Sequence, residues 1–265
     1  SIACVESSPI HIDTIKTLVE LGVEVWFEED IGDGINVKNQ TFVEAGLKKH
    51  SREDCLKNGN LIITNQALNN DDLEFVKSNT TILGMVNPFS NQDLINKCSS
   101  AKINLVSMEF IPRITRAQKM DVLSSQANLA GYVAVIESAK HLSTALPMMM
   151  TAAGTLKPAK VFVIGVGVAG LQAIATAKRL GARVEAFDTR DVVEEQVNSL
   201  GAKFVKIDLG ETGETDQGYA KELTEEQINK QKELISKDCE RSDIVITTAQ
   251  LFGRPAPMLF DISTI

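Results

Sequence analysis

The chain has 265 residues, of which 43% are apolar, and a formal net charge of −8 at pH 7. This length allows one large or two modest domains, and the apolar content is ordinary for a globular protein. The acidic balance disfavours a nucleic-acid surface, because phosphate backbones are bound mainly by lysine and arginine. The four cysteines are far apart and form no C-x-x-C pair. They therefore predict buried or idle thiols rather than a zinc site or a disulfide framework.

The first half of the chain alternates between strand-like and helix-like segments. Short apolar or alternating runs predict the strands, and apolar residues at helical spacing predict the helices between them. The expected strands are residues 2–5, 23–27, 61–64, 81–86 and 103–110, and the expected helices are residues 13–21, 41–49, 71–77 and 91–98. Such alternation favours a parallel sheet with crossover helices.

A polar segment studded with apolar residues, 112–124, separates this region from a long predicted helix at residues 125–142. We take that helix as the bridge between two Rossmann-like α/β domains, residues 1–124 and residues 125–265. The methionines of residues 147–150 are expected to fill gaps in a core, because the thioether side chain adapts to irregular spaces.

Residues 161–170 combine a β-branched apolar run with three glycines, Gly165, Gly167 and Gly170, in G-x-G-x-x-G spacing. A helical pattern follows, and a second strand-like run then ends on Asp188. This order of strand, tight turn, helix, strand and acidic residue is the dinucleotide-binding fingerprint. The alternative is that the glycines only allow a helix to pack closely on a strand. The uncharged stretch, residues 161–177, is shorter than the roughly 20 residues of a membrane span.

Each residue of the fingerprint has a physical reason. Gly165 can adopt a turn conformation that a Cβ forbids, Gly167 lets a pyrophosphate approach backbone N–H groups, and Gly170 lets the helix lie close to the strand. The N-terminus of the helix offers unpaired donors and a partial positive charge. Asp188 is expected to accept hydrogen bonds from the adenosine ribose and to repel a 2′-phosphate, which predicts NAD(H) rather than NADP(H).

The remaining sequence continues the pattern. Helices are expected at residues 192–200 and 225–239, strands at 203–208 and 243–248, and an irregular flap over the site at 209–224. In a doubly wound sheet the ligand lies outside the carboxyl ends of the strands. The residues that follow the last strand are therefore expected near the cofactor: Thr248, Ala249 and Gln250.

Five runs of sequence together resemble one family: residues 113–132, 148–154, 165–181 with Asp188, 218–222 and 247–257. The chain is similar to the NAD(H)-binding domain, or alpha subunit, of proton-translocating, Re/Si-specific NAD(P) transhydrogenases, in the superfamily that includes alanine dehydrogenase. The resemblance is strong from about residue 112 to 257 and only architectural before that.

The resemblance implies that NADH is bound in the cleft between the two domains. Hydride passes directly to NADP⁺ on a partner domain, and a membrane domain couples this transfer to proton translocation. It also implies a homodimer and a soluble domain at the membrane surface, facing the cytoplasm or a mitochondrial-type matrix.

The resemblance also assigns residues. Arg113, Gln118, Asp121 and Ser124 would line the nicotinamide end, although a structural salt bridge and helix cap are the alternative for this group. Tyr219 would lie on a mobile loop that closes over the nucleotide. The expected cofactor-binding set is completed by the neighbours of the fingerprint residues: Val168, Ala169, Thr189 and Arg190.

Alanine dehydrogenase is the alternative function, and it requires a proton acceptor and a group for the substrate carboxylate or carbonyl. That family has a lysine and a histidine for these roles. The corresponding strand ends here, residues 64–66 and 84–88, contain neither. A nucleotide-sensing module without catalysis is a third possibility. The family's domain continues past the position of Ile265, so we expect other residues to supply the remaining strands of the sheet.

Overall fold

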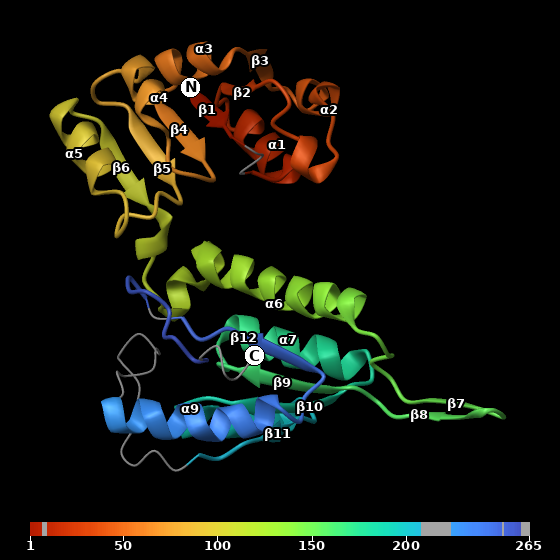
Figure 1. Cartoon of the computed structure of the whole chain (residues 1–265). Helices are drawn as coiled ribbons and strands as arrows, with labels where there is room; N and C mark the ends of the chain where they lie inside the picture. Colours follow the sequence, from red (N-terminus) through yellow and green to blue (C-terminus); the bar gives the residue numbers. More distant parts are fainter. Residues whose placement is uncertain (7–9, 208–223, 251, 261–265) are drawn as a thin grey trace. The chain divides into compact units, whose positions relative to one another are not determined.

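The computed structural model describes residues 1–6, 10–207, 224–250 and 252–260. The chain divides into two compact units, Ser1–Val122 and Leu123–Ile265 (Figure 1). Each unit is built on its own parallel sheet with helices packed against it. The predicted fold class, α/β with two Rossmann-like parallel sheets, is confirmed.

The sheet of the first unit has six parallel strands in the order β3-β2-β1-β4-β5-β6, the strand order of the Rossmann fold. The strands are β1 (Ile2–Val5), β2 (Val25–Glu28), β3 (Lys48–His50), β4 (Leu61–Thr64), β5 (Thr81–Gly84) and β6 (Asn104–Ser107). The helices are α1 (Ile12–Glu20), α2 (Asn39–Glu44), α3 (Arg52–Asn58), α4 (Asn70–Phe75) and α5 (Gln92–Ser100), with 3-10 turns at Asp33–Ile35, Met108–Phe110 and Thr115–Met120.

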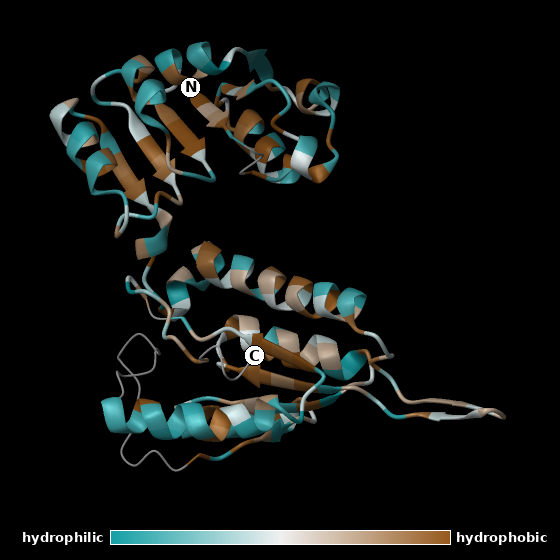
Figure 2. Cartoon of the chain, viewed as in Figure 1, coloured by the Kyte–Doolittle hydropathy of each residue, from teal (hydrophilic) through white to brown (hydrophobic). Residues whose placement is uncertain are grey.

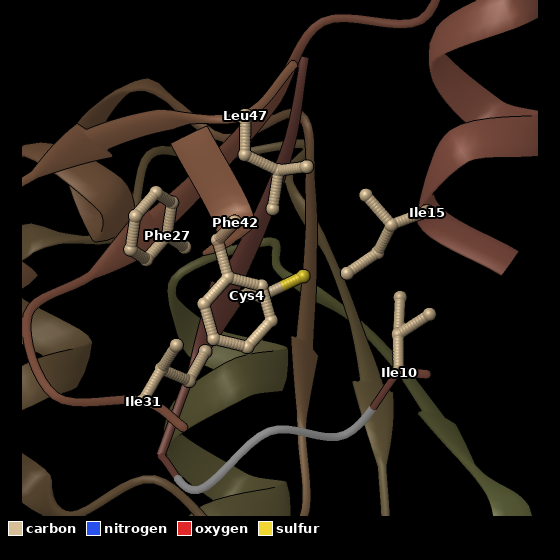
Figure 3. A pocket seen from close by; sticks show the side chains of 7 residues that line it. All are labelled: Cys4, Ile10, Ile15, Phe27, Ile31, Phe42 and Leu47. Carbon is tan, nitrogen blue, oxygen red and sulfur yellow. The ribbon is translucent and has the colours of Figure 1, made fainter. Parts of the chain in front are cut away.

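Strand β1 separates two apolar clusters because its successive side chains point to opposite faces of the sheet. Ala3 and Val5 join one cluster and Cys4 joins the other. Figure 3 shows the Cys4 thiol surrounded by apolar side chains of the second cluster, those of Ile10, Ile15, Phe27, Ile31, Phe42 and Leu47. Burial raises the pKa of Cys4 to about 12, so this thiol stays protonated. It is a core side chain, as the sequence predicted for the cysteines.

One predicted helix of this unit was wrong in its extent. Residues 41–49 were expected to be helical, but α2 ends at Glu44 and Lys48–His50 form the edge strand β3. Gly46 has φ +98°, a left-handed conformation that ends helices. The next helix, α3, was not predicted, because its seven residues are mostly charged and show little apolar periodicity.

The sheet of the second unit has four parallel strands in the order β11-β10-β9-β12. The strands are β9 (Lys160–Ile164), β10 (Arg183–Phe187), β11 (Lys203–Phe204) and β12 (Ile244–Thr247). The helices are α6 (Val122–His141), α7 (Val168–Arg179), α8 (Glu194–Ser199) and α9 (Glu225–Cys239), with a 3-10 turn at Asp191–Val193 before α8. The described part of β11 is shorter than the expected strand of residues 203–208, whose last residue lies outside the described chain.

Helices cover both faces of this sheet (Figure 1). Val161 and Val163 of β9 pack in the cluster that includes α6 and α7, whereas Phe162 and Ile164 pack with Ile235 of α9. Figure 2 shows the corresponding pattern, with hydrophobic β9 and β12 beside a predominantly hydrophilic α9. No helix among the described residues is both long and apolar enough to cross a membrane.

Helix α6 lies directly against the start of α7. A Cβ added to Gly131 would be 2.1 Å from the carbonyl oxygen of Ala169, so only glycine permits this approach. The alanines of α6 were expected to allow close packing, but the closest contact is made by Gly131.

The expectation that the methionines of residues 147–150 fill a core was wrong. Met149–Thr151 and Gly154–Leu156 form β7 and β8, an antiparallel hairpin that projects from the second unit (Figure 1). Its side chains are exposed, and Met150 retains 72% of its accessible surface. The chain reverses at Gly154, whose φ of +140° suits glycine, so the uncharged run forms a hairpin instead of entering the core.

Candidate functional site

Three strand ends of the second unit meet at one edge of the sheet. Strand β9 lies between β10 and β12 in parallel register, so the residues after these strands are neighbours. The N–H of Gly165 donates to the carbonyl of Phe187 at 2.8 Å, and the N–H of Thr248 donates to the carbonyl of Ile164 at 2.8 Å. The turn after β9 is therefore fixed on both sides.

Two of the fingerprint glycines are required by close approach. Gly165 has φ +92°, and a Cβ there would lie 2.8 Å from the backbone nitrogen of Ala249. A Cβ at Gly170 would lie 1.9 Å from the carbonyl oxygen of Gly165. The hydroxyl of Thr248 donates to that same oxygen at 2.7 Å. Helix α7 therefore starts as close to β9 as two backbones allow.

Gly167 differs from the other two glycines because its missing side chain faces open space. It is the N-cap of α7 and makes no side-chain capping bond, and a Cβ added to it would meet nothing within 4 Å. The first N–H groups of a helix have no acceptor inside the helix, and they carry the positive end of its dipole. The start of α7 therefore has both the room and the donors for an anionic group such as a diphosphate.

Asp188 lies next to this turn with only 8% of its surface exposed. Its Oδ2 accepts from the backbone N–H of Val166 at 2.7 Å, and its Oδ1 accepts from the backbone N–H of Arg190 at 2.9 Å. The Arg190 guanidinium adds two bonds of 2.9 Å, from Nε to Oδ1 and from Nη2 to Oδ2. The carboxylate is thus directed at the phosphate-binding turn, and protein donors already hold both of its oxygens.

The other predicted cofactor-binding residues flank the same edge. Val168 and Ala169 form the first turn of α7, and Thr189 lies half-buried between Asp188 and Arg190. Ala249 and Gln250 follow Thr248. Tyr219, expected on a loop over the nucleotide, lies outside the described residues.

The residues assigned to the nicotinamide end divide between the two units. Arg113, Gln118 and Asp121 belong to the last part of the first unit, and Ser124 lies in the first turn of α6. The N–H of Asp121 donates to the carbonyl of Gln118 at 3.3 Å, which brings these two residues together at the end of one 3-10 turn. The side chains of Arg113 and Gln118 are exposed.

A second charged cluster lies in the first unit, around Arg52. Its guanidinium donates to Glu28 at 2.8 Å, to both oxygens of Asp72 at 2.9 Å and to Glu6. The hydrogen bonds from Arg52 hold the pKa of Asp72 below its usual value. This network joins the ends of β1 and β2 to α3 and α4, so its groups serve one another. Within the described ranges, no group of three or more histidine, cysteine or acidic side chains could hold a metal ion.

Two features of the site were missed by sequence reasoning. One is the bond from Val166 N–H to Asp188, and the other is the pairing of Arg190 with Asp188. The Asp-x-Arg spacing at the end of a strand was the available signal for the second. Nothing in the sequence pattern indicated the first.

The chain matches two family models over nearly its whole length. The alanine dehydrogenase/PNT N-terminal domain matches residues 7–130, and the alanine dehydrogenase/PNT C-terminal domain matches residues 134–265.

Curated relatives include the first of the separate polypeptides that make up the NAD(P) transhydrogenase alpha subunit of Rhodospirillum rubrum, which is 44% identical over 94% of this chain and 67% of its own length. The corresponding protein of Rickettsia prowazekii is 44% identical over 91% of this chain and 64% of its own length. NAD(P) transhydrogenase subunit alpha of Haemophilus influenzae is 41% identical over 93% of this chain and 48% of its own length. The chain thus spans between about half and two thirds of these proteins.

Among solved structures, a transhydrogenase from Sinorhizobium meliloti matches with a TM-score of 0.85 and 38% identity, over 100% of this chain and 74% of that chain. An L-alanine dehydrogenase shares the fold, with a TM-score of 0.79 at 18% identity over 100% of this chain and 70% of that one. With matches to both domain models and these transhydrogenase relatives, the chain belongs to the alanine dehydrogenase/PNT family.

Proposed function

We propose that this chain is the NAD(H)-binding component of a proton-translocating NAD(P) transhydrogenase. The observation that carries the proposal is the open position at Gly167, above the N-terminus of α7 and beside a turn that Asp188 holds from below. The names of the relatives support the same assignment, since four of them are transhydrogenase alpha subunits or the first polypeptide of one.

The parts of the dinucleotide have separate partners in this proposal. The N–H groups at the start of α7, from Val168 to Gly170, bind the diphosphate, and the end of β10 binds the adenosine ribose. Thr248, Ala249 and Gln250 flank the nucleotide at the end of β12. The nicotinamide end extends into the cleft between the two domains.

Bound NADH supplies the hydride, which passes to NADP⁺ on a separate NADP(H)-binding domain. This transfer needs no protein nucleophile; it needs alignment of two nicotinamide rings and exclusion of water. Gln118 and Asp121 suit that task because an amide and a carboxylate can satisfy a carboxamide, while Arg113 and Ser124 complete the polar set. The proximity of Gln118 and Asp121 in one turn supports a shared role.

The partners follow from the same assignment. A membrane domain couples hydride transfer to proton translocation, and this chain faces the cytoplasm or a mitochondrial-type matrix at the membrane surface. A second copy of the chain completes a homodimer. The exposed apolar hairpin of β7 and β8 supports self-association, because an isolated two-stranded hairpin is only marginally stable in water.

The alternative function, an NAD-dependent alanine dehydrogenase, has less support. Asn65 and Gln66 follow β4, and residues 85–88 follow β5, so neither strand end offers a lysine or histidine for substrate or proton transfer. His50 stacks on Trp26 with 3.9 Å between ring centroids, and His141 is the exposed last residue of α6.

A direct experiment separates these functions. The chain is titrated with NADH and with NADPH by nucleotide fluorescence, and then mixed with an NADP-binding transhydrogenase domain to follow hydride transfer. Binding of NADH followed by transfer supports the proposal. NADH production from alanine and NAD⁺ would favour the alternative, and absence of NADH binding would reject both.

A further inference from the structure

The carboxylate of Asp188 has a dedicated cationic partner. Arg190 donates from Nε to Oδ1 and from Nη2 to Oδ2, both at 2.9 Å, which is the bidentate geometry of strong arginine–carboxylate pairs. The two side chains are only 13% and 7% exposed, so water screens this pair weakly.

The hydrogen-bonding capacity of Asp188 is also full. Each oxygen accepts two bonds: Oδ1 from the backbone and Nε of Arg190, and Oδ2 from Val166 N–H and from Nη2 of Arg190. A carboxylate has about four acceptor sites in total. A ribose hydroxyl that bonds to Asp188 must therefore share or displace one of these donors.

This pairing changes the electrostatic argument for cofactor choice. An isolated carboxylate at the end of the second strand repels a 2′-phosphate, but a carboxylate with a guanidinium on both oxygens presents a nearly neutral pair. We propose that Arg190 sets the preference between NADH and NADPH by neutralising Asp188. The inference rests on the proposed NAD(H) site and assigns its selectivity to the pair rather than to Asp188 alone.

Arg190 has a second contact that must be separated from this effect. Its Nη2 also donates to the carbonyl oxygen of Val166 at 3.2 Å, so the side chain ties the glycine turn to the end of β10. Loss of that tie weakens both nucleotides, because both place a diphosphate on the same turn. A purely structural role therefore lowers the two affinities together, whereas charge compensation changes their ratio.

The test measures the ratio of the dissociation constants for NADPH and NADH in the wild type, Arg190→Met and Arg190→Lys. Removing the charge exposes Asp188 to the 2′-phosphate, so Arg190→Met should raise the ratio by about three- to tenfold. Arg190→Lys keeps the charge and should stay near the wild-type ratio. The increase should shrink in high salt.

An unchanged or lowered ratio in Arg190→Met, with a native circular dichroism spectrum, would overturn the inference while leaving NADH binding intact. If Arg190→Met does not fold, Arg190→Gln replaces it, because glutamine keeps a donor toward Asp188 without the charge. A raised ratio in Arg190→Gln supports the inference and an unchanged one overturns it. Failure of the wild type to bind NADH would instead reject the proposed function, and the inference with it.

Discussion

The backbone N–H of Val166 donates a hydrogen bond to Oδ2 of Asp188 at 2.7 Å, although the two residues are 22 positions apart. This bond joins the glycine turn after β9 to the end of β10. Since Asp188 is buried, its charge supports the shape of the turn as well as facing the site. Binding and stability are therefore coupled at this position.

Replacing Asp188 by asparagine should weaken NADH binding and reduce the discrimination against NADPH. The amide offers one oxygen acceptor instead of two, and Arg190 is left as an uncompensated cation beside the ribose. The loss of stability should be roughly 1–3 kcal/mol, since buried donors lose a charged acceptor. Fluorescence titrations with both nucleotides and a thermal melt measure the two effects. Asp191→Asn, at an exposed neighbouring position, is the control. An unchanged nucleotide preference in Asp188→Asn would argue against this role.

Two glycine-to-alanine changes should have opposite consequences. Gly167 has no neighbour within 4 Å of a new Cβ, so Gly167→Ala should fold normally and lose about tenfold or more in NADH affinity. Gly170→Ala places a Cβ 1.9 Å from the carbonyl oxygen of Gly165, so its main effect should be a loss of stability of about 1–3 kcal/mol or more. Chemical denaturation and NADH titration of the two variants distinguish the cases. Normal NADH affinity in a folded Gly167→Ala would show that no diphosphate approaches this turn.

The strands and the glycine turn could be predicted because their signals are local. The buried β-branched run of β9 and the spacing of Gly165, Gly167 and Gly170 depend on neighbours in sequence. Most helix boundaries were predicted within a few residues for the same reason, since their apolar residues recur at helical spacing.

The errors arose where distant contacts decide the structure. Residues Lys48–His50 became a strand because β2 offers them an edge, and both lysines pair with acidic residues, Lys48 with Glu24 and Lys49 with Glu29. The methionine run was assigned to a core because composition says nothing about whether another element covers it. The bonds to Asp188 depend on side-chain geometry between two strand ends, which residue spacing alone does not determine.

The contact between α6 and α7 should depend on Gly131. Alanine favours helices over glycine by about 1 kcal/mol, yet Gly131→Ala should destabilise the second unit because the new methyl would lie 2.1 Å from the Ala169 carbonyl oxygen. Asn128→Ala, at an exposed position of α6, gives the propensity effect alone and should be neutral or slightly stabilising. Urea unfolding of both variants measures the difference. A stabilised Gly131→Ala would mean that the two helices can separate at no cost.

The Arg52 network should make the first unit sensitive to acid. Because Arg52 lowers the pKa of Asp72 in the folded state, the unfolded state binds protons more readily, and the stabilisation is lost as the pH falls through about 4 and below. Arg52→Met should lose roughly 1–3 kcal/mol at pH 7, between the values for exposed and buried ion pairs, and should show a smaller further loss in acid. Unfolding curves between pH 3 and pH 7 test both effects. Lys57→Met, which breaks an exposed pair with Glu53, is the control and should change little. Equal acid sensitivity in wild type and Arg52→Met would remove Asp72 as the cause.

The hairpin of β7 and β8 should be required for the proposed homodimer. Met149 pairs with Leu156 across the two strands, Met150 is exposed beside them, and no charged residue lies between Met148 and Leu156. A carboxylate placed on such a surface must be desolvated when a second copy covers it, so Met150→Glu should shift the chain from dimer to monomer. Light scattering after size-exclusion chromatography, over a range of protein concentrations, measures this shift. Leu21→Glu introduces the same charge at an exposed apolar residue of the first unit, and it should leave the dimer intact. A dimer of unchanged affinity in Met150→Glu would place the self-association surface elsewhere on the chain.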